Sequence, residues 1–273
     1  MDRSGVSSEN LIWGKDRGLV IYRIPKEKTN YINWGDKDEV EMLMRTYNQF
    51  VWTPVNLLTA NSTLNECNFT EKFGRQYYQY KFMRVKCSEP LKGDLLLQKK
   101  SVDKYGGYYS SRYNISKDKE TGYPRSVKGS YPWTNIDFET AKTVSATMLE
   151  SETDSTHLMY GAEYDTRIKW VVESGTATAG EVTEDSTKLG NYHNKSYPNI
   201  MVKTGEDGCL NNIYGFAGNV DELTQEESNR CNGLIRGGGC NCDGAICNAS
   251  IRNYYYQYGD LRNTGFRTTL CIE

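Results

Sequence analysis

The sequence Asn211-Asn212-Ile213-Tyr214-Gly215-Phe216-Ala217-Gly218-Asn219-Val220-Asp221-Glu222 decides the fold of this chain, together with Gly265-Phe266-Arg267 near its end. Between these two runs, Arg236-Gly237-Gly238-Gly239 leads into a segment of Cys, Asn and Tyr that extends over residues 240–263. Such residues do not build a hydrophobic core, whereas the apolar flanks on both sides have the composition of strands. We therefore expect this segment to be a surface loop on a rigid scaffold, where functional residues usually lie.

Composition and charge exclude several classes of function. The chain has 273 residues and a formal net charge of -2, so it lacks the basic field that nucleic-acid binding requires. No window approaches the roughly 18 uninterrupted apolar residues of a spanning helix, so we expect no membrane insertion. The first residues lack the apolar segment of a signal peptide. This predicts cytoplasmic synthesis and leaves open a later display on a virion or a cell surface.

The N-terminal part of the chain reads mainly as strands. Its hydrophobic periodicity predicts strands at residues 19–24, 50–55 and 78–82 and a short helix at residues 39–47. We expect residues 1–100 to form a strand-rich segment that packs on the main domain, residues 101–273, or attaches that domain to something larger.

The main domain mixes helices and strands. Its pattern predicts a strand at residues 105–113, helices at 137–150 and 161–173, a long loop at 174–210 and short strands after 211. Glu163 and Asp165 are expected to serve the first turn of the second helix. This order of elements indicates a single irregular α+β domain.

Five segments of this domain, in order, are similar to one known family. They are Gly107-Tyr108-Tyr109-Ser110-Ser111-Arg112-Tyr113; Pro132-Trp133-Thr134-Asn135-Ile136; His157-Leu158-Met159-Tyr160-Gly161-Ala162-Glu163-Tyr164-Asp165; residues 211–222; and Arg236-Gly237-Gly238 with Gly265-Phe266-Arg267. The chain resembles the formylglycine-generating enzyme (sulfatase-modifying factor) family, especially its non-catalytic members from gut Firmicutes and phages and the variable proteins of diversity-generating retroelements. The resemblance implies an irregular C-type lectin-like α+β fold with two helices and short antiparallel strands.

The family's enzymes oxidise a sulfatase cysteine to formylglycine with copper(I) held by two thiolates, and the resemblance places Cys242 and Cys247 at that pair. Soft thiolates suit copper(I), but such a site also needs surrounding groups that orient its ligands. The chain departs from the enzymes at Gly239 in place of Ser, at Asp243 in place of the His or polar partner after the first cysteine, and at Asp221 and Leu223 in place of two Trp residues. The three thiols of Cys240, Cys242 and Cys247 are also consistent with reduced loop residues or one incidental disulfide.

Other members of the family bind ligands without catalysis, and residues 240–263 have the composition of a binding surface. Tyrosine rings with adaptable polar groups, as in residues 253–260, are typical of paratopes. The alternative is that Tyr254, Tyr256 and Tyr258 face inward at strand spacing and pack. The candidate ligand-binding residues are Cys240, Asn241, Asp243, Ile246, Asn248, Ser250, Asn253, Tyr254, Tyr255, Tyr256, Tyr258, Asp260 and Arg262.

The binding interpretation predicts a protein or glycan receptor on a cell surface as partner, in a phage tail or adhesin-type protein that acts as a homo-oligomer or a particle component. Asn219 and Glu222 match positions at which family members bind calcium through oxygen ligands, so a structural calcium ion is a further expectation. His157 opens one of the family motifs, and we expect it to be structural. The alternative function is a copper-dependent oxidase that uses Cys242 and Cys247.

Overall fold

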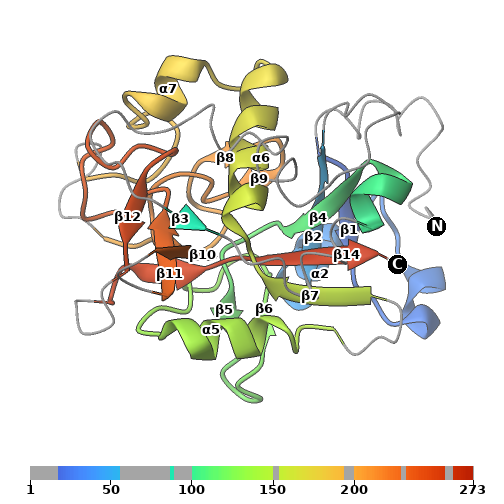
Figure 1. Cartoon of the computed structure of the whole chain (residues 1–273). Coiled ribbons are helices and arrows are strands. Elements are labelled where there is room, and N and C mark those ends of the chain that lie inside the picture. Colours follow the sequence, from blue (N-terminus) through green and yellow to red (C-terminus); the bar gives the residue numbers. More distant parts are fainter. Residues whose placement is uncertain are drawn as a thin grey trace.

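A computed structural model describes residues 18–55, 87–88, 100–149, 154–193, 200–228, 232–255 and 261–272. Helices and mostly antiparallel sheets are interleaved along the chain, which confirms the α+β class (Figure 1). Within the described residues, no helix has the length and apolar character needed to cross a membrane.

The first of two five-stranded sheets contains strands from near both ends of the chain. Its strand order is β1-β2-β4-β14-β7, and every neighbouring pair is antiparallel. The strands are β1 (Val20–Tyr22), β2 (Gln49–Pro54), β4 (Gly107–Ser111), β14 (Thr268–Ile272) and β7 (Asp154–Leu158). Because β2 pairs with β4 over five residue positions, from Phe50 opposite Ser111 to Pro54 opposite Gly107, the early strands are part of the same sheet as the C-terminal strands.

The second sheet carries the polar segment identified in the sequence. Its order is β12-β11-β10-β13, and β3 (Cys87–Ser88) also pairs with β10. The strands are β10 (Asp221–Ser228), β11 (Asn232–Arg236), β12 (Arg252–Tyr254) and β13 (Thr264–Phe266). β10 and β13 are parallel, unlike the antiparallel strands expected. The intervening hairpin and long loop allow this, since parallel strands need a crossover connection.

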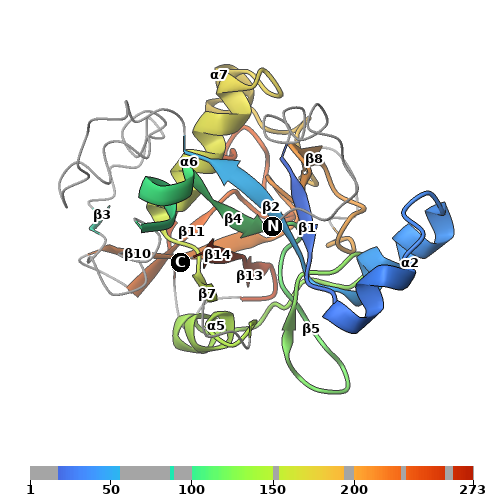
Figure 2. The same ribbon diagram turned by 90° about the vertical axis from the view of Figure 1, so that its right-hand side faces the viewer.

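The two helices expected in the main domain are present as α5 (Phe138–Ser145) and α6 (Gly161–Glu173). α6 lies above β14 and β7 and α5 below them in Figures 1 and 2. The other described elements are η1 (Lys26–Tyr31), α2 (Lys37–Thr46), α7 (Ala179–Thr183), β5 (Ser116–Lys117), β6 (Pro124–Arg125), β8 (Cys209–Leu210) and β9 (Ile213–Tyr214).

Two details differ from the sequence-based prediction. α7 lies inside the expected loop at residues 174–210, where Thr178 caps the helix by accepting a hydrogen bond from the Glu181 backbone N–H. The predicted strand at residues 105–113 begins only at Gly107, because residues 100–105 are helical. The strand expected at residues 78–82 lies outside the described residues.

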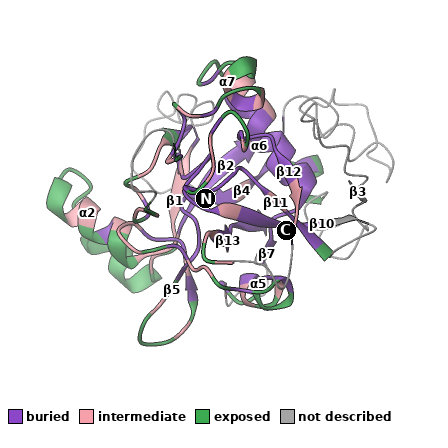
Figure 3. Ribbon diagram, turned by 90° about the vertical axis from the view of Figure 1, so that its left-hand side faces the viewer, coloured by how far each residue is buried: buried purple, intermediate pink, exposed green. Residues whose placement is uncertain are grey.

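The core divides around the sheets. Tyr164, Ile168 and Val171 of α6 pack with Ile213 and Phe216, while Phe138 and Ala141 of α5 belong to a second cluster beneath the strands. Figure 3 shows α6 and the central strands buried, and much of α2 exposed. Helix α6 is therefore a buried element that neighbouring loops can pack against.

Candidate functional site

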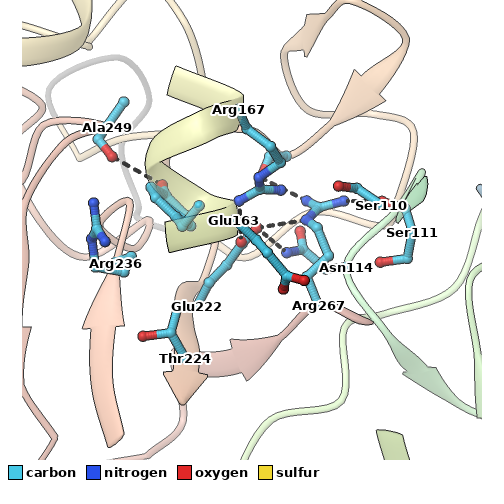
Figure 4. A network of polar contacts seen from close by, with 12 residues as sticks. Ser110, Ser111, Asn114, Glu163, Arg167, Glu222, Thr224, Arg236, Ala249 and Arg267 are labelled. Atoms are coloured by element: carbon cyan, nitrogen blue, oxygen red, sulfur yellow. Dashed lines mark hydrogen bonds and ion pairs between the residues drawn. The ribbon is translucent and has the colours of Figure 1, made fainter. Parts of the chain in front are cut away.

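The centre of the molecule holds a buried charge network around Glu222 of β10 (Figure 4). Its Oε1 accepts hydrogen bonds from Arg267 Nε at 2.9 Å and from Asn114 Nδ2 at 2.9 Å. Its Oε2 accepts one from Arg167 Nη2 at 2.8 Å. Glu222 is 2% exposed and both arginines are 0% exposed, so these charges interact with little screening by solvent.

Arg267 also donates hydrogen bonds to backbone carbonyl groups on both sides of the network. Arg267 Nη1 donates to Ser111 O at 2.8 Å, and Nη2 donates to Tyr214 O at 2.7 Å and to Gly215 O at 3.0 Å. Burial raises the pKa of Glu222, but the charges of Arg267 and Arg167 outweigh burial and hold the net pKa below its ordinary value. Glu222 is therefore an ionised structural anion.

A second buried network forms a closed ring of four charges. Arg236 donates to Asp165 Oδ1 at 2.5 Å and to Glu226 Oε2 at 2.8 Å. Arg252 donates to the other oxygen of each acid, to Asp165 Oδ2 and, at 2.9 Å, to Glu226 Oε1. Arg236 Nε also donates to Ile251 O at 2.7 Å. The ring connects α6, β10, β11 and β12, and it anchors the C-terminal end of residues 239–251, which we call loop 239–251.

The inner side of loop 239–251 is hydrogen-bonded to its neighbours. Tyr164 of α6 donates its hydroxyl to Ala249 O at 2.9 Å. The Ser250 backbone N–H donates to Val182 O of α7 at 3.0 Å, and His193 N–H donates to Cys242 O at 3.0 Å. These contacts hold the loop against α6, α7 and the segment that follows α7.

The outer side of the loop is accessible. Ile246 is 62% exposed, Asn241 and Arg262 are also exposed, and Asp243 is partly exposed. Asn253 and Tyr254 of β12 are half-buried at the edge of the second sheet. Six predicted ligand-binding residues thus retain accessible side-chain surface.

Four other predicted ligand contacts are buried, so their side chains do not face a ligand at the surface. Asn248 and Ser250 bond to each other through Asn248 Oδ1 and Ser250 Oγ at 2.9 Å, as parts of the inner turn. Cys240 is 1% exposed and lies near Asn263. Tyr255 is 5% exposed and packs in the cluster with Phe138, because it follows β12 with its ring toward the core.

The tyrosine cluster is only partly described. Of the three tyrosines that the packing alternative places inward, the described residues include Tyr254, which is half-buried; its neighbour Tyr255 is buried. Tyr256, Tyr258 and Asp260 lie outside the described residues.

Cys242 and Cys247 are linked by a disulfide across the loop. The expected copper(I) site rests on two thiolates, and a disulfide offers none. In this oxidation state the pair does not fit a copper site. It closes the loop covalently instead.

The expected calcium ligands do not fit a cation either. Asn219 Oδ1 accepts hydrogen bonds from Val202 N–H at 2.9 Å and from Asn191 Nδ2 at 3.1 Å. Both oxygens of Glu222 are occupied by guanidinium or amide N–H donors. A calcium ion would have to displace these donors and lie close to two buried positive charges.

A third cluster brings His157, Glu163 and Cys271 together, with potential ligand atoms within 4.8 Å of one another. Glu163 Oε1 bonds to His157 Nε2 at 2.8 Å, and Glu163 Oε2 accepts from Tyr160 N–H at 2.7 Å and from Thr269 Oγ1 at 2.8 Å. The bond to Tyr160 confirms Glu163 as a residue of the first helical turn. Through Glu163, this cluster connects α6 to His157 of β7 and Thr269 of β14 by hydrogen bonds.

The prediction for Asp165 was wrong, because this residue belongs to the four-charge ring rather than to the first turn of the helix. Sequence reasoning also missed Arg167 and Glu226. Arg167 lies between Thr166 and Ile168 on α6, and Glu226 lies in the polar run 224–228. No local pattern in the sequence therefore marked either charge as buried, because charged residues are usually exposed unless the fold supplies a partner.

Comparison of the chain with protein-family models and with curated proteins found no match. The chemistry of the site is therefore inferred from its own residues.

Proposed function

We propose that this chain is a non-catalytic ligand-binding protein that recognises a protein or glycan receptor on a cell surface. The recognition surface comprises the accessible residues of loop 239–251 with Asn253, Tyr254 and Arg262, on a scaffold of C-type lectin-like type. The biological setting that we propose is a phage tail or an adhesin-type surface protein, diversified by a retroelement.

One observation carries the proposal: loop 239–251 has a fixed inner side and an accessible outer side. The four-charge ring, the Tyr164 hydroxyl and the disulfide hold its backbone in place. A preorganised loop loses less conformational entropy on binding than a flexible one, so more of its contact energy appears as affinity.

The composition of the outer side also supports binding rather than catalysis. Ile246 offers apolar area, Tyr254 an aromatic ring, and Asn241 and Asn253 adaptable hydrogen-bonding groups.

The test compares surface variants in binding to a panel of bacterial cells and to a glycan array. The double variant Ile246→Ala/Tyr254→Ala should bind at least about tenfold more weakly, because aromatic and apolar anchors dominate interfaces. The matched control is Met42→Ala/Tyr31→Ala, which removes exposed apolar side chains from α2 and η1, remote from the loop. Equal loss in both double variants would contradict the proposal, as would an unchanged profile in the loop variant.

Diversification has its own test in the gene. Independent copies should differ at codons for accessible residues such as Asn241, Ile246 and Tyr254. Codons for the buried Asn248 and Arg252 should stay constant, because changes there would damage the support of the loop. Identical copies without a nearby template repeat would exclude the retroelement part of the proposal.

A further inference from the structure

A separate cavity of about 830 Å³ lies between the β5–β6 hairpin, the end of α2 and residues 129–134. Figure 2 shows the hairpin beside α2. No residue of loop 239–251 lines the cavity. Its volume is within the range of about 300–1,000 Å³ that is typical of small-molecule sites.

The cavity is positively charged although the whole chain is slightly negative. Its wall has five cationic side chains and two acidic ones: Arg45, Lys117, Lys119, Arg125 and Lys203, with Asp118 and Glu120. Asp118 is already paired with Arg125 at 2.7 Å, and Arg45 is paired with Glu41 at 2.8 Å. The remaining excess of lysine charge favours an anionic ligand.

Aromatic rings lie among these cations. Tyr131 is 56% exposed, and Lys203 Nζ lies 5.7 Å from the centroid of its ring. Lys117 Nζ lies 4.7 Å from the centroid of the Trp133 ring. A flat ring next to an ammonium group suits a ligand that combines a C–H face, which packs on the ring, with an acid group, which pairs with the cation.

The wall is held by backbone hydrogen bonds. Gly129 N–H donates to Thr204 O at 2.8 Å, Thr204 N–H donates to Ser130 O at 2.8 Å, and Trp133 N–H donates to Ile115 O at 2.7 Å. The aromatic side chains therefore extend from a braced segment, which limits the entropy lost when a ligand binds.

We propose that this cavity binds an acidic saccharide, meaning sugar units that carry carboxylate or sulfate groups. The volume of about 830 Å³ is much larger than a single phosphate needs. The hydroxyl-bearing Ser130 and Thr134 in the wall suit sugar hydroxyl groups. Nucleic acid is disfavoured because the formal net charge of the chain is -2.

The experiment titrates the full chain with four probes by calorimetry: a galacturonate tetramer, a sulfated heparin disaccharide, neutral maltotetraose and a short oligothymidylate. At least one acidic saccharide should bind, and the two acidic probes distinguish carboxylate from sulfate recognition. Lys119→Gln/Lys203→Gln and Tyr131→Ala should each weaken binding at least about tenfold. Affinity should also fall with added salt, because the lysines are exposed.

Matched controls separate a specific site from general charge. Lys26→Gln/Lys28→Gln removes two exposed lysines from η1, and Tyr31→Ala removes an exposed ring there; both should leave binding unchanged. The proposal is overturned by no binding of either acidic saccharide at millimolar concentration, by tighter binding of oligothymidylate, or by equal loss in the control variants. Since the cavity shares no residue with loop 239–251, its failure would leave the proposed receptor-binding function untouched.

Discussion

Arg267 donates its Nε to Glu222 Oε1 at 2.9 Å, and both side chains are buried. Each residue ends one of the two short runs that frame the C-terminal part of the sequence. The ion pair thus lies where β10 and β13 run parallel, with Glu222 opposite Gly265 in the register. It gives both charged groups a partner in the core, where an unpaired charge would be costly.

Glu222→Gln should destabilise the fold by about 3–5 kcal/mol, because it leaves Arg167 and Arg267 buried without their shared anion. Urea unfolding measures the change. Glu41→Gln is the matched control: Glu41 pairs with Arg45 and Lys128 at the surface, where such a pair contributes about 0–1 kcal/mol. Similar losses in the two variants would mean that the buried network is not a stabilising element.

Arg252→Met should loosen loop 239–251, because the variant leaves Asp165 and Glu226 with one arginine in place of two. Hydrogen exchange of the loop amides should accelerate about tenfold or more, while β2 and β4 stay protected. Arg45→Met, at an exposed ion pair, is the control. Unchanged exchange in the loop would show that the disulfide and the backbone contacts suffice to hold it.

The raised pKa of Asp221 should make the free energy of unfolding depend on pH. Burial raises the pKa of Asp221 from 3.8 to about 7. Between these values the folded protein holds a proton that the unfolded chain has lost, so the contribution of this group to stability falls as pH rises from about 4 to about 7.

Asp221→Asn should remove that dependence. The variant should match the wild type at about pH 4 and be more stable than it at about pH 8, as measured by urea unfolding. Some slope should remain, because burial raises the pKa of Asp207 to about 6 and acts in the same direction. A variant that follows the wild-type curve throughout would argue that Asp221 is ionised in the folded protein.

Because Cys242 and Cys247 form a disulfide, we expect that this pair does not bind copper(I). Without reductant, Cys242 and Cys247 should resist alkylation while the exposed Cys209 reacts. An anaerobic copper(I) titration in a competing chelator should then show no difference between wild type and Cys242→Ala/Cys247→Ala.

The same double variant should have a free energy of unfolding that is lower by roughly 2 kcal/mol, as expected for the loss of a disulfide that closes a short loop. One-to-one copper binding by the reduced wild type, lost in the variant, would favour the oxidase alternative.

Local patterns predicted much of the secondary structure. The apolar positions of α6 recur at helical spacing, and the strand at residues 50–55 is observed as β2 over Gln49–Pro54. The secondary-structure prediction failed where a few local hydrogen bonds stabilise an element that the residue composition does not indicate. The Thr178 and Glu181 cap stabilises α7 in a segment whose Gly, Ser and Thr content suggested only a loop.

The candidate site was predicted less well than the fold. The sequence located the polar segment, but it did not separate the accessible Ile246 from the buried Asn248 two positions later. In an irregular loop no fixed period relates sequence to direction, so burial depends on what packs underneath. Here that support is α6 and α7, which precede the loop by dozens of residues.

By itself the sequence determined the α+β class, the low net charge and the position of a polar loop between two apolar flanks, because these depend on composition and on short-range periodicity. Only the tertiary structure decided which charges meet. Arg167 and Glu222 are 55 positions apart, and Asp165 and Arg252 are 87 apart. A charge is buried only where the fold supplies its partner, and that depends on how distant strands align rather than on any local pattern.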